Sequence, residues 1–111
     1  MMNIESVKMP AATLVKVKGR MDAEAAPAFL KVCEALAKDG ALQQVVDLQG
    51  LEYISSAGLS QVLLAARSVK AMGGTMVLCG LQGIVKQIFT VTKFDSLLPI
   101  YQTADEAFAK I

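Results

Sequence analysis

Two short apolar runs with a long helical pattern between them constrain the fold of this chain more than any other feature. Residues 44–48 (QVVDL) and 75–79 (TMVLC) have the length and composition of buried strands. Between them, residues 57–72 place apolar side chains at the i, i+3, i+4, i+7 spacing of a helix, and Gly73-Gly74 supplies a stop. A strand, a helix and a strand in this order predict a right-handed parallel crossover and an α/β fold.

The flanking segments complete a small α/β domain. Residues 4–7 and 13–18 are rich in β-formers and predict a pair of N-terminal strands. A first helix is expected to run up to Gly40, with Pro27 in its first turn and Asp22 as its candidate N-cap. Residues 84–89 predict a third helix, residues 100–101 a short edge strand, and the capping-box spacing of residues 103–106 a final helix.

Length and composition indicate one domain with a large core. The chain has 111 residues, so we expect a single domain over residues 1–111. Its hydrophobic fraction is 54%, which suggests strands covered on both faces. No uninterrupted apolar run approaches the ~20 residues of a membrane-spanning helix, so no stable membrane insertion is expected. The N-terminus lacks the pattern of a secretory signal, and the expected location is the cytoplasm.

The residue types that are missing exclude several classes of function. The net charge of +1 offers no basic field for a phosphate backbone, so we expect no nucleic-acid partner. The chain has no histidine, which removes the commonest general base and zinc ligand, and we expect neither an enzyme, nor a metal site, nor a cofactor. Cys33 and Cys79 lie in apolar periodic segments and are interpreted as buried small hydrophobes.

Any function is best sought in residues 47–59, between the central strand and the second helix, because ligands and partners meet open α/β sheets at strand C-termini. Asp47 is expected to emerge at that edge. Ser55 and Ser56 stand just before the helix, where a hydroxyl can cap free N–H groups. The same position would also tolerate a phosphoryl group, which would face those donors and the positive end of the macrodipole. Ala57 and Gly58 would leave room for an approaching macromolecule, although small residues also serve packing.

A family resemblance favours the second of these roles. The run VVDLQGLEYISSAGLSQVLL, with Gly19-Arg-Met-Asp22 upstream and Gly-Gly-Thr-Met-Val-Leu-Cys-Gly downstream, resembles the STAS domain and in particular the bacterial anti-sigma factor antagonists. The match in spacing covers essentially the whole chain. It implies a single STAS-like domain whose mixed central sheet has four to five strands and about four helices.

The resemblance also implies a mechanism. In such proteins the unmodified form binds an anti-sigma factor that is itself a serine kinase; phosphorylation by that kinase releases the antagonist, and a serine phosphatase resets it. Carried over, the phosphoacceptor is Ser56, with Ser55 in reserve. Many members have Asp directly before the acceptor, where this chain has Ser55. Asp22 matches an acidic position near this serine, and Asp47 matches the aspartate that ends the central strand and would organise the following loop.

The expected partner surface combines these residues with their neighbours: Asp22, Tyr53, Ile54, Ser55, Ser56, Ala57, Gly58, Leu59 and Val62. Several have a structural interpretation as well. Asp22 serves equally well as a helix cap, Asp47 as an acceptor for the amides that follow it, and Tyr53 and Ile54 as packing for the loop. Leu59 and Val62 would join the surface only if the helix is half covered.

Two other functions remain open at this point. The runner-up is a STAS-type accessory subunit of a transporter or signalling scaffold, which binds a partner without a phosphorylation cycle. A small enzyme that uses Asp22, Asp47 and Ser56 is disfavoured, because no neighbouring base is evident to activate the serine.

Overall fold

The computed structural model describes all 111 residues. Its five strands form one sheet, and their order in space, β1-β2-β3-β4-β5, is their order in the sequence. β1 (Met2–Lys8) runs antiparallel to β2 (Thr13–Met21), as the N-terminal strand pair predicts. β3 (Gln43–Ile54), β4 (Thr75–Cys79) and β5 (Ile100–Tyr101) continue the sheet in parallel. The prediction of a mixed sheet is confirmed.

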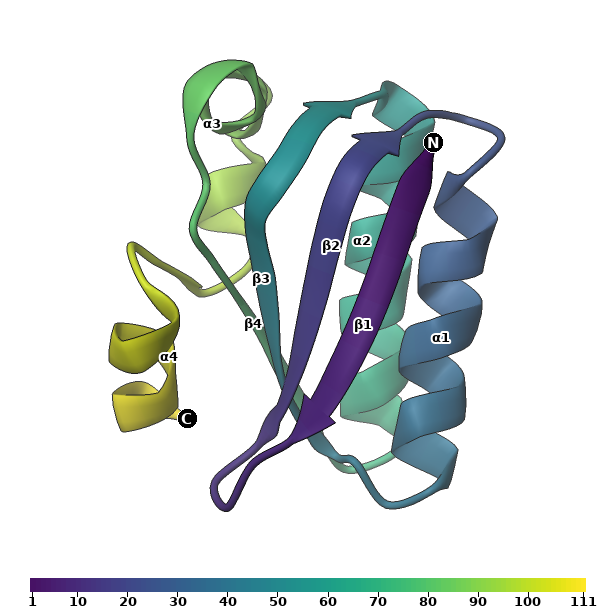
Figure 1. Cartoon of the computed structure of the whole chain (residues 1–111), viewed down its shortest axis with the longest axis vertical. Helices are drawn as coiled ribbons and strands as arrows, with labels where there is room; N and C mark the ends of the chain where they lie inside the picture. Colours follow the sequence, from purple (N-terminus) through teal and green to yellow (C-terminus); the bar gives the residue numbers. More distant parts are fainter.

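Four helices connect and cover the strands. α1 (Ala26–Lys38) connects β2 to β3, α2 (Ser56–Ala71) connects β3 to β4, and the two helices lie together along one face of the sheet (Figure 1). α3 (Gly83–Val91) and a 3-10 turn, η1 (Phe94–Ser96), precede β5, and α4 (Ala104–Lys110) follows it. Thr103 caps α4 by accepting a hydrogen bond from the Glu106 amide. No helix combines the length and the apolar character that crossing a bilayer would require.

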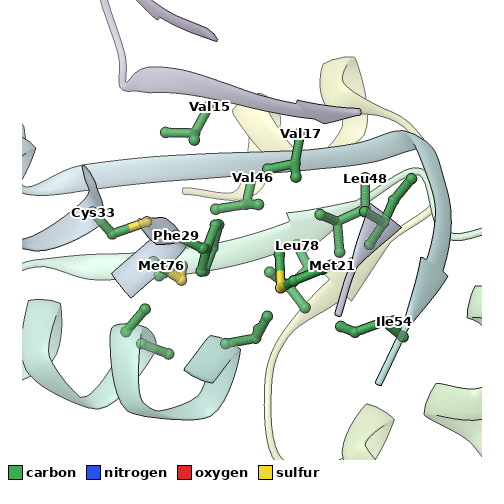
Figure 2. Close-up of a cluster of buried hydrophobic side chains, with 14 of the residues drawn as sticks. Val15, Val17, Met21, Phe29, Cys33, Val46, Leu48, Ile54, Met76 and Leu78 are labelled. Carbon is green, nitrogen blue, oxygen red and sulfur yellow. The ribbon is translucent and has the colours of Figure 1, made fainter. Parts of the chain in front are cut away.

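Strand alternation divides the buried side chains between the two faces of the sheet. The larger cluster lies under α1 and α2, and Figure 2 shows Val46 of β3 in it near Phe29 of α1, with Leu48 further along β3. The smaller cluster, with Val45 and Val77, lies under α4. The first half of β3 and most of β4 are thus covered on both faces as expected, whereas β1 and β2 are only partly so: Glu5 and Lys18 are exposed.

The central strand is longer than the sequence predicts. Residues 49–54, interpreted as part of a loop, continue β3 to Ile54. They remain paired because β2 runs alongside as far as Met21, with Ile54 opposite Met21, after register shifts that begin between Lys16 and Lys18. β4 by contrast leaves β3 at Asp47. The last seven of the twelve residues of β3, residues 48–54, therefore have a strand neighbour on one side only, and the segment before α2 is held by the sheet.

Both cysteines are buried free thiols, which confirms their interpretation as small core residues. Burial raises the pKa of each thiol from 9.0 to about 12, and the nearby carboxylates of Glu34, for Cys33, and of Asp47, for Cys79, add to the effect. The cause in both cases is mainly the cost of placing a thiolate in an apolar core. The native protein therefore keeps two protons that the unfolded chain gives up in alkali.

We therefore expect the free energy of unfolding to fall as the pH rises above 9.0, and to keep falling towards about 12. In this range the unfolded chain binds fewer protons than the native one, at a cost of about 1.4 kcal/mol per pH unit for each thiol. Urea unfolding at a series of pH values measures the slope. The Cys33→Ala/Cys79→Ala variant should show a shallower alkaline slope, and parallel slopes would contradict the assignment.

Candidate functional site

The start of α2 is attached to the end of β2, and this junction forms the candidate site. The Ser55 amide donates a hydrogen bond to the Met21 carbonyl at 2.9 Å. Because β2 and β3 end side by side, the turn that leaves Met21 towards α1 lies next to the first turn of α2, at the upper end of the sheet in Figure 1. Residues far apart in the sequence thus meet at one edge.

Ser55 is the N-cap of α2, and its hydroxyl is fully engaged. Its backbone is extended, with φ −86° and ψ 171°, and its Oγ accepts a hydrogen bond from the Gly58 amide at 3.0 Å. The same hydroxyl donates to the Met21 carbonyl at 3.3 Å. Capping of this kind satisfies a helix amide that otherwise has no partner. Of the two serines, Ser55 has the structural role.

Ser56 is the first residue of α2, and its side chain points into solvent. It is exposed, and its hydroxyl makes no hydrogen bond within the chain. The amides of Gly58 and Leu59 bond to the side chain and the carbonyl of Ser55, while the amides of Ser56 and Ala57 have no partner in the chain. A free hydroxyl therefore stands beside two free donors at the positive end of a 16-residue helix.

Gly58 lets α2 approach the sheet closely. A Cβ at this position would lie 2.7 Å from Cγ1 of Ile54 and 2.8 Å from the Met21 carbonyl oxygen. Gly58 is buried, and Ala57 is half-buried. Gly58 thus serves packing at the junction, whereas Ala57 stays partly open to solvent beside Ser56.

Four members of the expected partner surface lie in the core. Leu59 and Val62 face the sheet with exposed fractions of 3% and 0%, so the prediction that they join a half-covered helix face is wrong. Ile54 and Gly58 are buried as well. Helix periodicity shows which residues of α2 share a face. It does not show that the sheet covers this face along its whole length. Tyr53, Ser55 and Ala57 are partly exposed, and Ser56 is exposed.

Arg20 is a site residue that the sequence analysis missed. Its guanidinium lies over the Tyr53 ring, 4.4 Å from the ring centroid, a cation–π contact beside the junction. The two residues are paired across β2 and β3, but only after the register shifts. The β-rich run up to residue 18 was the only available indication that β2 continued towards Arg20.

Asp22 organises the turn after β2 and does not cap α1. Its Oδ1 accepts a hydrogen bond from the Ala25 amide at 2.9 Å, and its carbonyl accepts one from Ala26. α1 begins only at Ala26, where the N-cap residue, Ala25, offers no side-chain acceptor. Asp22 is half-buried and directly follows Met21, to which Ser55 is bonded. The structure therefore brings Asp22 and the two serines to the same edge.

Asp47 lies elsewhere. It is within β3, not at its end, and its Oδ1 accepts a hydrogen bond from the Gln49 amide at 2.9 Å, in keeping with its interpretation as an acceptor for the following amides. At ~3.3 Å per residue, β3 carries the chain roughly 20 Å further before Ile54. Asp47 instead lines a small cavity of about 160 Å³ with Gly80, Gln82 and Thr103. The expectation that Asp47 ends the central strand is wrong, because β3 continues to Ile54.

Comparisons with known proteins identify the family to which this fold belongs. Residues 3–107 match the model of the STAS domain family. BtrV of Bordetella bronchiseptica, which is named as an anti-sigma factor antagonist, is 40% identical over 70 residues, or 63% of this chain. The matched part spans 60% of the length of that relative.

Two solved structures share the fold at low sequence identity. An anti-sigma factor antagonist from Thermotoga maritima superposes with a TM-score of 0.87 and 21% identity, covering 97% of this chain and 93% of that one. SpoIIAA of Bacillus, in its phosphorylated form, gives a TM-score of 0.71 and 17% identity, covering 99% and 98%. Because the family model matches nearly the whole length of the chain and its fold is shared by these structures, the chain belongs to the STAS domain family.

Proposed function

We propose that this STAS domain is an anti-sigma factor antagonist, and that phosphorylation of Ser56 switches it off. The unmodified form binds an anti-sigma factor that is a serine kinase and thereby frees a sigma factor; a serine phosphatase restores the unmodified form. The name of the 40% identical relative and those of the structural neighbours support the class of protein. The observation that supports Ser56 is that its hydroxyl is exposed and unbonded.

The two serines differ in their hydrogen bonds, and this difference favours Ser56 over Ser55 as the phosphate acceptor. Transfer of a phosphoryl group to Ser55 would remove the hydroxyl that donates to Met21 and would bring charge to the oxygen that caps Gly58. Transfer to Ser56 breaks no bond within the chain. A kinase can therefore modify Ser56 on the folded domain, without first opening the junction.

The fold also tolerates the product. A phosphate on Ser56 would lie within reach of the free amides of Ser56 and Ala57, at the end of α2 where the macrodipole favours negative charge. α2 would therefore stay formed after modification. The change that a partner meets is then a local change of charge, with no large rearrangement of the domain.

The added charge is large enough to release a partner. A phosphate carries about −1.5 to −2 charges, and a unit charge ~4 Å from a partner carboxylate costs about 4 kcal/mol at an effective dielectric constant near 20. Since ~1.4 kcal/mol is tenfold in affinity, even a partly screened clash dissociates a micromolar complex. Asp22, Tyr53 and Ala57, all partly exposed around Ser56, are the residues we assign to the same contact surface.

The acceptor can be identified by incubating the chain with ATP and an anti-sigma factor serine kinase, followed by mass spectrometry. We expect wild type and Ser55→Ala to gain one phosphate and Ser56→Ala to gain none. Because Ser55 is the cap, Ser55→Ala should also lower the free energy of unfolding by about 1 kcal/mol, whereas Ser56→Ala should change it by less than about 0.5 kcal/mol. Loss of phosphorylation in a folded Ser55→Ala variant, with Ser56→Ala still modified, would reverse the assignment.

The effect of charge can be measured on the complex with the same kinase by isothermal titration calorimetry. Ser56→Asp should weaken binding at least about tenfold, while the uncharged Ser56→Asn should bind nearly as wild type. Ser60→Asp is the matched control, because Ser60 is exposed one turn further along α2. Equal affinities for Ser56→Asp and Ser56→Asn would contradict a charge switch. A stable complex in which neither serine gains a phosphate when ATP is present would favour the accessory-subunit function instead.

A further inference from the structure

A groove on the far half of α2 is one of two large, partly apolar hollows outside the Ser56 site. It lies between α2, the start of β4 and the segment after η1, and its volume is about 470 Å³. Leu63, Met76 and Leu98 provide apolar side chains for it, and Leu97 stands at its edge with 54% of its surface exposed. Nothing in the chain covers this leucine.

The charges around the groove have one sign. Arg67 and Lys70 line the α2 side, and both are exposed. No acidic residue is among those that line the groove, and α2 contains none at all. Neither cation has an acidic partner within the chain at ion-pair distance. An apolar floor beside two unpaired cations is complementary to a ligand that is apolar on one face and acidic on its flank.

We propose that this groove binds an acidic, amphipathic helical segment of a partner protein. Apolar side chains spaced i, i+3, i+4 and i+7 on such a helix would pack against Leu63, Leu97 and Leu98, and its carboxylates would meet Arg67 and Lys70. A membrane surface or a nucleic acid is a poorer fit, because the groove offers only two cations and the whole chain carries a net charge of +1.

The groove shares a face of α2 with the phosphorylation site but does not depend on it. Ser56 and Arg67 are eleven residues apart, which is close to three helical turns and about 16 Å along the axis. Leu63 and Lys70 lie on the same side of the helix, seven residues apart. A segment bound in the groove would therefore lie further along α2 than Ser56, and it could anchor a partner without contact to Ser56.

The test is to select peptides without assuming their sequence. A phage library of random peptides, about 14 residues or four helical turns long, is panned on the full-length chain and counter-selected on Arg67→Glu/Lys70→Glu. We expect the recovered sequences to be amphipathic with net negative charge. For synthetic versions, fluorescence anisotropy should show binding at least about tenfold weaker to Arg67→Glu/Lys70→Glu and clearly weaker to Leu97→Ser.

Matched controls separate the groove from a general effect of charge or surface. Lys31→Glu/Lys38→Glu makes the same change on α1, with Lys38, like Lys70, in the last turn of its helix. Val91→Ser removes an apolar side chain that is 80% exposed and does not line the groove. Both controls should bind as wild type, and thermal melts should show every variant folded.

Three results would overturn the proposal. The first is recovery of basic or charge-indifferent peptides, or of none that depends on the groove. The second is equal loss of binding in Arg67→Glu/Lys70→Glu and Lys31→Glu/Lys38→Glu. The third is a dimer of the chain in sedimentation experiments that Leu97→Ser dissociates, which would assign the groove to a second copy.

Discussion

The hydrogen bonds between Ser55 and Met21 hold the candidate site together. Through its amide and its hydroxyl, Ser55 fixes the first turn of α2 to the end of β2, and Gly58 lets the two backbones approach closely enough for this. The position of Ser56 follows from that attachment: as the first residue after the cap, its side chain is directed away from the sheet. A rigid junction thus presents one free hydroxyl in a fixed place, which is what recognition by another protein requires.

The same attachment explains why neighbouring residues differ so sharply in role. Ile54 and Leu59 are core residues, although they bracket the serines in sequence, because the end of a strand and the first turn of a helix each direct one face inward. Arg20 and Asp22 precede the serines by more than thirty residues in the sequence. The pairing of β2 with β3 brings them to the same edge of the sheet as the serines. The surface around Ser56 is therefore built from the ends of β2 and β3, the turn after β2 and the first turn of α2, and it contains fewer residues than the sequence analysis expects.

Much of this architecture could be predicted, because periodicity and stop residues are local. The crossover, the N-terminal strand pair and the final capped helix needed only patterns within about 15 residues. The length of β3 could not be predicted, since Gln49 and Gly50 interrupt its apolar pattern and only pairing with β2 keeps the strand formed. The separation of Asp47 from the serines follows from the length of β3, so it could not be predicted either. The α2 groove was equally hidden, because residues 94–99 carry no periodicity that would place Leu97 beside α2.

The identity of spatial and sequential strand order bears on how the domain acquires its structure. Each strand pairs only with strands that are its neighbours in the chain, so no pairing waits for a distant segment and loop-closure entropy stays modest at each step. The sheet can grow from its N-terminal hairpin in the direction of synthesis, each crossover helix docking as the next strand arrives. The Ser55–Met21 attachment then becomes available once β3 has emerged, well before the C-terminal helices exist.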